Sequence, residues 1–184
     1  MLARQETLGP AAPYLPAESV MRRLDAQFYD RVLRLPLLPS GSDVSRALVR
    51  LQALAPAETL RQWRDELRGA VSEASDVATL RTLVAWVMDC FPRRVAPDAF
   101  LEGAAAVLSA ERVSPAVLAS ACLTLIAERK RSPSIADFVA GCRAQRARFE
   151  RALKTIERAE IVRHNATLIA RPALATSHVE EIFQ

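Results

Sequence analysis

Residues 77–91, VATLRTLVAWVMDCF, decide the fold class of this chain. Their apolar side chains recur at three- and four-residue steps and cover most of the circumference of a helix. A helix that is apolar nearly all round is typical of the interior of a helical assembly. Pro92 ends this segment, and shorter helical patterns continue on both sides of it. The chain is therefore predicted to be all-α, a helical bundle with residues 77–91 at its centre.

The segments before this stretch read as one-sided helices. From Ala17 onward, apolar residues form one stripe, which Pro36 and Pro39 end. Two further helices are expected from about Asp43 and from Pro56. The stripe of the first helix consists of Met21, Leu24, Phe28, Val32 and Leu35.

The segments after it predict two short helices and one long one. Pro97 and Pro115 open the short helices at first-turn positions. Ser134 and Asp137 form a variant of the capping box, which marks the start of the long helix. Its apolar stripe is interrupted at Gln145 and Arg146. We therefore expect its later turns to pack on something other than the bundle core, either the N-terminal helices or a second chain.

Together these patterns predict a bundle of about six to seven helices with a long C-terminal helix and a flexible tail. Residues 1–16 are rich in proline and are expected to be a flexible N-terminal arm. Residues 17–163 form the predicted helical bundle domain, with a sub-boundary near residues 72–76. After Arg163 the periodicity is lost and Pro172 follows, so residues 164–184 are expected to be a C-terminal tail.

The long helix turns from apolar to arginine-rich near Arg143, and this is the candidate partner-binding surface. Two interpretations remain open. The face can be ordinary solvated helix surface with favourable pairs at four-residue spacing, or it can contact phosphate or an acidic protein patch. The residues nominated for partner binding are Arg143, Arg146, Arg148, Phe149 and Arg151.

Composition favours a small protein that stays in the cytoplasm. The 184 residues carry a net charge of +4, with a pI near 9.4, which permits an acidic partner without requiring one. No apolar run approaches the roughly 20 residues of a membrane-spanning helix. The N-terminus lacks the basic-then-apolar order of a signal peptide.

Catalytic and metal-binding motifs are not recognisable in the sequence. Its two histidines, His164 and His178, lie in or near the expected tail. The cysteines Cys90, Cys122 and Cys142 are widely spaced within helical patterns, so we interpret them as reduced core thiols. The glycines form no phosphate-binding loop. We therefore expect no metal, no cofactor and no enzymatic activity.

From Thr79 to about Arg146 the chain resembles the small helical loaders and inhibitors of replicative helicase encoded by phages and prophages. The resemblance is carried by Phe91-Pro92, by Pro115, and by the segment from Ser132 to Phe138, SPSIADF. It implies a non-enzymatic adaptor that binds a replicative DNA helicase and loads or restrains it. Residues 17–74 have no counterpart in the family.

Two alternatives to the helicase adaptor stay open from the sequence. One is a structural or regulatory interaction protein of mobile-element origin, such as a virion component or a host-enzyme inhibitor, with self-association as homo-oligomers. The other is weak nucleic-acid contact through the arginine-rich helix, which would weaken steeply with salt.

Overall fold

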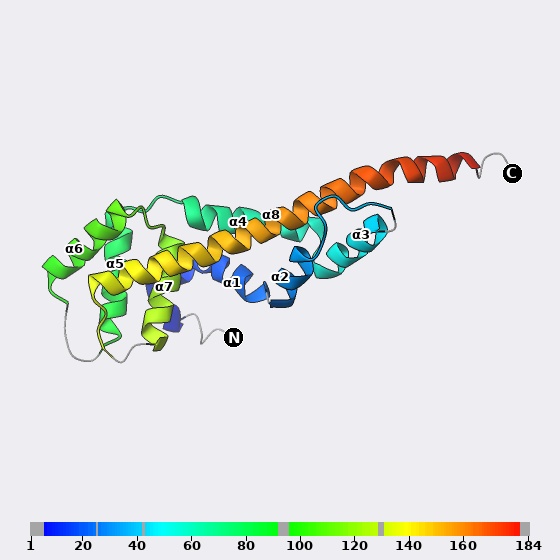
Figure 1. Cartoon of the computed structure of the whole chain (residues 1–184). Coiled ribbons are helices and arrows are strands. Elements are labelled where there is room, and N and C mark those ends of the chain that lie inside the picture. Colours follow the sequence, from blue (N-terminus) through cyan, green and yellow to red (C-terminus); the bar gives the residue numbers. More distant parts are fainter. Residues whose placement is uncertain (1–5, 25, 42, 92–95, 129–130, 181–184) are drawn as a thin grey trace. The chain divides into compact units, whose positions relative to one another are not determined.

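The computed structural model describes residues 6–24, 26–41, 43–91, 96–128 and 131–180, with side chains described from Gly9 to Ala170. These residues form helices and turns without a strand, so the predicted all-α fold is confirmed. The described helices are the 3-10 helix η2 and the α-helices α1 to α8. Figure 1 labels the α-helices. Within this part of the chain no helix is both long and apolar enough to cross a lipid bilayer.

The chain divides into two compact units, each built from two separate stretches. The first unit contains Met1–Met21 and Glu66–Arg151, and the second contains Arg22–Asp65 and Ala152–Gln184. One of the points at which the chain passes between the units lies between Asp65 and Glu66, and the sub-boundary near residues 72–76 stays a prediction. Helix α4 (Ala57–Ser72) continues through this point, so the boundary has no turn or proline to mark it in the sequence.

The first unit is organised around α5 (Val77–Asp89) and α7 (Pro115–Glu128). Helix α5 packs against both α7 and α6 (Asp98–Ala110), as expected for a central helix. The most completely enclosed helix is nevertheless α7, where residues 115–122 are all buried. Small residues such as Ala119 and Ala121 let neighbouring helices approach it closely, and this signal is weaker in a sequence than the large apolar residues of α5.

Side-chain caps fix where two of these helices begin. Asp76 accepts hydrogen bonds from the Thr79 N–H and hydroxyl, both at 2.7 Å, at the start of α5. These bonds hold the pKa of the Asp76 carboxyl below its usual value. At the start of α8 (Ile135–Glu180), the Ser134 N–H donates to Asp137 Oδ2 at 2.8 Å, and the Asp137 N–H donates to Ser134 Oγ at 3.3 Å. The predicted capping box is confirmed.

The predicted N-terminal arm is in part folded. Residues Glu6–Tyr14 form η2, which packs against α5 and α7 and buries Ala11 completely. Gly9 has φ +49°, and a Cβ there would lie 2.7 Å from Trp86 Nε1. Glycine is needed at this position because the left-handed backbone and the indole leave no room for a side chain. The remaining arm residues, 1–5, lie outside the described residues.

The second unit is formed by short amphipathic helices and the later turns of α8. The single helix expected from Ala17 is two helices: α1 (Pro16–Arg23), which belongs to the first unit up to Met21, and α2 (Ala26–Leu33), which belongs to the second. All five residues of its predicted stripe are buried, so the periodicity continues through the break and does not reveal it. This is one reason why the structure has more helices than the predicted six to seven. Helix α3 (Asp43–Leu54) follows. The rings of Phe28 on α2 and Trp63 on α4 pack edge to face, with their centroids 6.2 Å apart.

The later turns of α8 contact α4 and the C-terminal ends of α2 and α3, which confirms the first of the two alternatives drawn from the interrupted stripe. The buried side chains on this part of α8 include Ile156, Ala159, Val162 and Ala166. Arg64 on α4 pairs with Glu160 at 2.9 Å. The helix also continues past Arg163, where the sequence indicated a tail, and passes through Pro172 to Glu180. Residues 181–184 lie outside the described residues.

Candidate functional site: a charged groove on the first unit

Two of the arginines predicted to bind a partner, Arg143 and Arg146, contact the C-terminal end of α6. Arg143 donates to Glu111 Oε1 at 2.7 Å. Arg146 donates to the backbone carbonyl of Arg112. The last carbonyls of a helix have no partner within the helix, and cations stabilise them. Both arginines therefore contribute to the folded state of the first unit.

The end of α6 is a left-handed turn of the Schellman type. The Val113 N–H donates to the Leu108 carbonyl at 3.0 Å, and the Arg112 N–H donates to the Ser109 carbonyl at 2.9 Å. Arg112 occupies the left-handed position, with φ +52°, where glycine is more usual. Buried Val113 and Leu108 supply the hydrophobic contact that accompanies this motif. The turn presents the Arg112 side chain to solvent.

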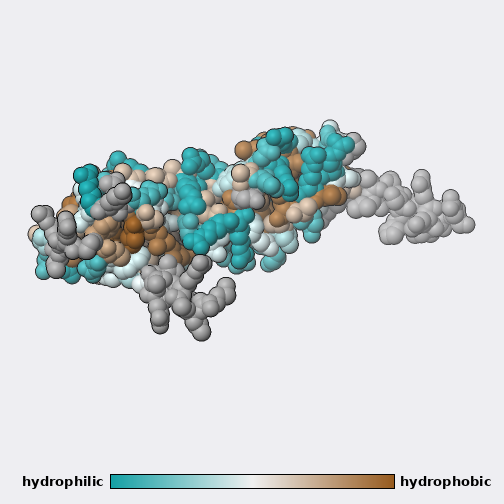
Figure 2. Space-filling view, turned by 90° about the horizontal axis from the view of Figure 1, so that it is seen from below, coloured by the Kyte–Doolittle hydropathy of each residue, from teal (hydrophilic) through white to brown (hydrophobic). Residues whose placement is uncertain are grey.

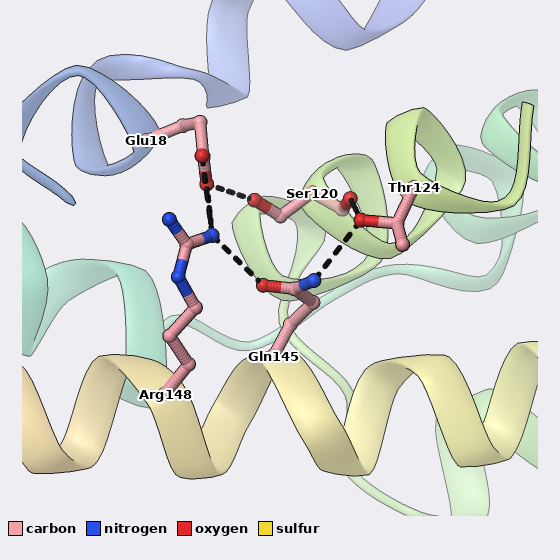
Figure 3. Close-up of polar contacts among 5 residues, drawn as sticks. All are labelled: Glu18, Ser120, Thr124, Gln145 and Arg148. Carbon is pink, nitrogen blue, oxygen red and sulfur yellow. Dashed lines mark hydrogen bonds and ion pairs between the residues drawn. The ribbon is translucent and has the colours of Figure 1, made fainter. Parts of the chain in front are cut away.

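Arg148 belongs to a polar network on a different side of α8, which Figure 3 shows. Its guanidinium contacts both carboxylate oxygens of Glu18 on α1 at 3.2 Å and also donates to Gln145 Oε1 at 3.2 Å. Glu18 in turn accepts the Ser120 hydroxyl at 2.6 Å, and Gln145 donates to Thr124 Oγ1 at 3.1 Å. The network joins α1, α7 and α8, so Arg148 has a role in holding these three helices together.

Phe149 was nominated as a contact residue, and this was wrong because its side chain is only 1% exposed. It continues the apolar stripe of α8 after Phe138 and Cys142, with half-buried Gln145 in between. The apolar stripe of α8 is therefore interrupted only by the half-buried Gln145, and it continues on the same face at Phe149. Arg151 is exposed and also interacts within the chain.

Arginines of the second unit follow the same principle. Arg158 donates to the Leu35 carbonyl, just after α2, at 2.9 Å. Arg163 donates to the Leu51 and Ala55 carbonyls at the end of α3, at 3.0 and 2.7 Å. Burial lowers the pKa of the Arg163 guanidinium. Many arginines of α8 are thus neither a solvated face nor a single contact surface: they bind the C-terminal ends of shorter helices.

A separate groove on the first unit is the best candidate site. It has a volume of about 450 Å³ and lies where the turn after α4, the end of α6 and the middle of α8 meet. Of the nominated residues, only Arg146 lines it. The lining residues are Val71, Ser72, Glu73, Ala74, Ser75, Ser109, Arg112, Val113, Arg146 and Glu150.

The groove carries charges of both signs and several hydroxyl groups. Arg112, Glu73 and Glu150 are exposed, and within the described part of the chain the structure shows no ion pair for their side chains. The Ser75 hydroxyl oxygen is buried and has no hydrogen-bond partner among the described residues. A buried polar atom without a partner costs about 1–3 kcal/mol. The groove therefore offers groups that a polar ligand would satisfy.

Only a local signal for this groove is present in the sequence. Ser72, Glu73 and Ser75 lie in a polar interval between two helices, which marks a turn. That this turn faces the end of α6 and the middle of α8 depends on long-range packing. Glu73, Ser109, Arg112 and Glu150 were consequently not nominated.

The thiols show no sign of a metal site. Cys122 and Cys142 are buried, whereas Cys90 is exposed, which corrects the expectation of three core thiols. Burial raises the pKa of the Cys142 thiol to about 12. Among the described residues, no group of three or more histidine, cysteine or acidic side chains is placed to hold a metal ion.

Comparisons with known proteins add no relative: no protein-family model matches the chain, and no curated protein or solved structure matches it either.

Proposed function

We propose that this protein is a non-enzymatic adaptor that binds a protein partner through the groove on its first unit. The observation that carries the proposal is the combination of exposed charges and an unpartnered hydroxyl around a hollow of about 450 Å³. Protein-binding sites combine such polar groups with apolar contacts. Val71, Ala74 and Val113 supply the apolar part of this lining.

The proposed partner is a replicative DNA helicase of a phage or its host, acting in the cytoplasm. The resemblance of residues 79–146 to helicase loaders and inhibitors supports this choice. Four of the ten residues that line the groove lie in that segment: Ser109, Arg112, Val113 and Arg146. The adaptor would load or restrain the helicase and would leave nucleotide hydrolysis to it. Direct nucleic-acid binding receives less support, because Arg143 and Arg148 pair with carboxylates of their own chain.

The test is to mix the purified full chain with the replicative helicase of the source cell and to measure co-elution and ATPase rate. Arg112→Glu is the variant of choice because its side chain is exposed and the change places a third carboxylate beside Glu73 and Glu150. Arg50→Glu on α3 is a matched control, since Arg50 is also exposed and lies outside the groove. We expect the complex with the wild type and the control, and a weakened complex with Arg112→Glu.

Absence of both a complex and a rate change with the wild-type protein would refute the helicase partner. Equal binding by Arg112→Glu and Arg50→Glu would show that the groove is not the docking site. Charge reversal at Arg146 or Arg148 is a poorer test, because each reversal removes a bond that holds the first unit together.

Self-association is the second part of the proposal, and exposed apolar side chains of the second unit support it. Leu38 is 73% exposed and Val49 is 69% exposed, while Leu33 and Leu37 are also exposed. Figure 2 shows hydrophobic patches among the hydrophilic residues of one face of the molecule. Measurement of the mass in solution over a range of concentrations tests this. A Leu38→Ser variant should shift the distribution toward monomer if these exposed side chains mediate association.

A further inference from the structure

The groove has a definite arrangement of charge along α8. Arg146 and Glu150 both line it, and they lie four residues apart on the same helix. Residues at this spacing share one helix face and are separated by about 6 Å along the axis. The wall that α8 forms is thus positive at one point and negative one turn later.

The other walls repeat this mixed character. Arg112 comes from the turn after α6, and Glu73 comes from the turn after α4. The four ionisable residues that line the groove have charges that sum to zero. A polyanion such as a nucleic acid would place phosphates beside both carboxylates, which costs free energy. A ligand with charges of both signs complements the groove better.

We infer that the groove binds an extended peptide segment of a partner protein in which an acidic and a basic residue are two positions apart. This inference rests on the proposed protein-binding function. In an extended chain, residues i and i+2 point to the same side and are about 6.6–6.8 Å apart. This spacing matches the turn from Arg146 to Glu150. Adjacent residues point to opposite sides and cannot face both.

The remaining groups of the groove suit the peptide backbone and the intervening residue. The Ser75 hydroxyl has no partner, and the Ser72 hydroxyl, which donates to the Arg68 carbonyl at 2.7 Å, keeps lone pairs that can accept a backbone N–H. Val113 and Val71 give an apolar contact for a small side chain between the two charged ones. The volume is within the range of about 300–1,000 Å³ that is usual for ligand pockets.

The test uses acetylated, amidated pentapeptides and the full ¹⁵N-labelled chain, with binding followed by amide chemical shifts. Gly-Asp-Ala-Lys-Gly should shift the amides of Ser75, Ser109 and Arg112. The adjacent-charge peptide Gly-Ala-Asp-Lys-Gly should bind more weakly, by roughly two- to fivefold, because one exposed ion pair is lost. Equal binding of both peptides, or no shift with either, would overturn the inference.

A charge reversal on the protein tests the inference by a change in peptide preference, which an unfolded variant would not show. In Glu150→Lys, the preference should move from Gly-Asp-Ala-Lys-Gly to Gly-Asp-Ala-Asp-Gly. Glu102→Lys on α6 is the matched control, since Glu102 is exposed and outside the groove, and it should keep the original preference. A preference that is unchanged in Glu150→Lys overturns the inference.

These outcomes separate the inference from the helicase proposal. Peptide binding at the groove without a helicase complex would support the inference and refute only the proposed partner. A helicase complex that Arg112→Glu weakens, combined with no response to any of the peptides, would refute the inference and keep the adaptor function.

Discussion

Replacing Glu18 by alanine should destabilise the first unit, and the network of Figure 3 allows the size of the effect to be worked out. Glu18 accepts the Ser120 hydroxyl at 2.6 Å, and the Ser120 residue is only 3% exposed. Without the carboxylate this buried hydroxyl loses its acceptor, at a cost of about 1–3 kcal/mol. Arg148 also loses its ion pair, but its side chain is 38% exposed and water compensates, so this part is worth at most about 1 kcal/mol.

The expected sum for Glu18→Ala is about 1–4 kcal/mol. For a chain of this length it corresponds to a fall in Tm of roughly 2–16 °C. The assay is urea unfolding followed by circular dichroism, in parallel with a thermal melt. Glu102→Ala, which removes an exposed carboxylate on α6, is the matched control and should change the free energy of unfolding by less than about 0.5 kcal/mol.

A double-mutant cycle with Ser120→Ala tests the physical reason. When both partners are removed, no buried hydroxyl is left without its acceptor, so the double variant should be more stable than the sum of the single effects by about 1–2 kcal/mol. A Glu18→Ala variant within about 0.5 kcal/mol of the wild type, or single effects that simply add, would refute this account of the network.

Four further outcomes follow from the structure. Phe149→Ala should lower the free energy of unfolding by about 3–5 kcal/mol in a urea titration, because it leaves a cavity in the core; a change below about 1 kcal/mol would return Phe149 to the surface. Arg112→Gly should raise Tm slightly. It removes the strain of a side chain at a left-handed backbone position, about 1–2 kcal/mol in the folded state, and this exceeds the cost of the extra conformational entropy of the unfolded chain, about 0.5–1 kcal/mol. A lower Tm than that of Arg112→Ala would contradict this. Arg163→Met should destabilise the chain by about 1–2 kcal/mol, since two bonds to the end of α3 are lost while burial of the guanidinium is relieved; a more stable variant would mean that burial outweighs the bonds. The pKa of the Cys142 thiol is raised from 9.0 to about 12, so its contribution to stability is complete below pH 9 and is lost between about pH 9 and 12; Cys142→Ala should show a smaller loss over that range in pH-dependent melts.

The fold could be predicted largely because this chain marks its helices with strong local signals. Ser134 and Asp137 predicted the start of α8, and Pro115 predicted the start of α7. The break between α1 and α2 escaped prediction because Met21, Leu24 and Phe28 keep helical spacing across it. The periodicity of apolar residues indicates which face of a segment is buried, but it does not indicate whether the segment is one helix or two.

The candidate site could be predicted far less well, and Arg146 shows why. Its residue type and helical position were visible in the sequence, whereas its partner is a carbonyl 34 residues earlier. Backbone carbonyls have no sequence signature, so an arginine that caps a distant helix looks the same as one that awaits a partner. The burial of Phe149 was missed although the apolar stripe resumes at this residue, because the polar turn at Gln145 and Arg146 indicates that the helix leaves the bundle core.

The use of α8 to complete shorter helices has a consequence for biosynthesis. The carbonyls after α2, at the end of α3 and in the turn after α6 receive their arginine partners from residues that the ribosome adds later. In the nascent chain, the carbonyls at the ends of α2 and α3 must therefore be hydrogen-bonded to water until Arg158 and Arg163 have left the exit tunnel. Neither unit can reach its final structure during most of translation, and a ribosome stalled before residue 140 would hold a chain with exposed apolar helix faces that chaperones recognise.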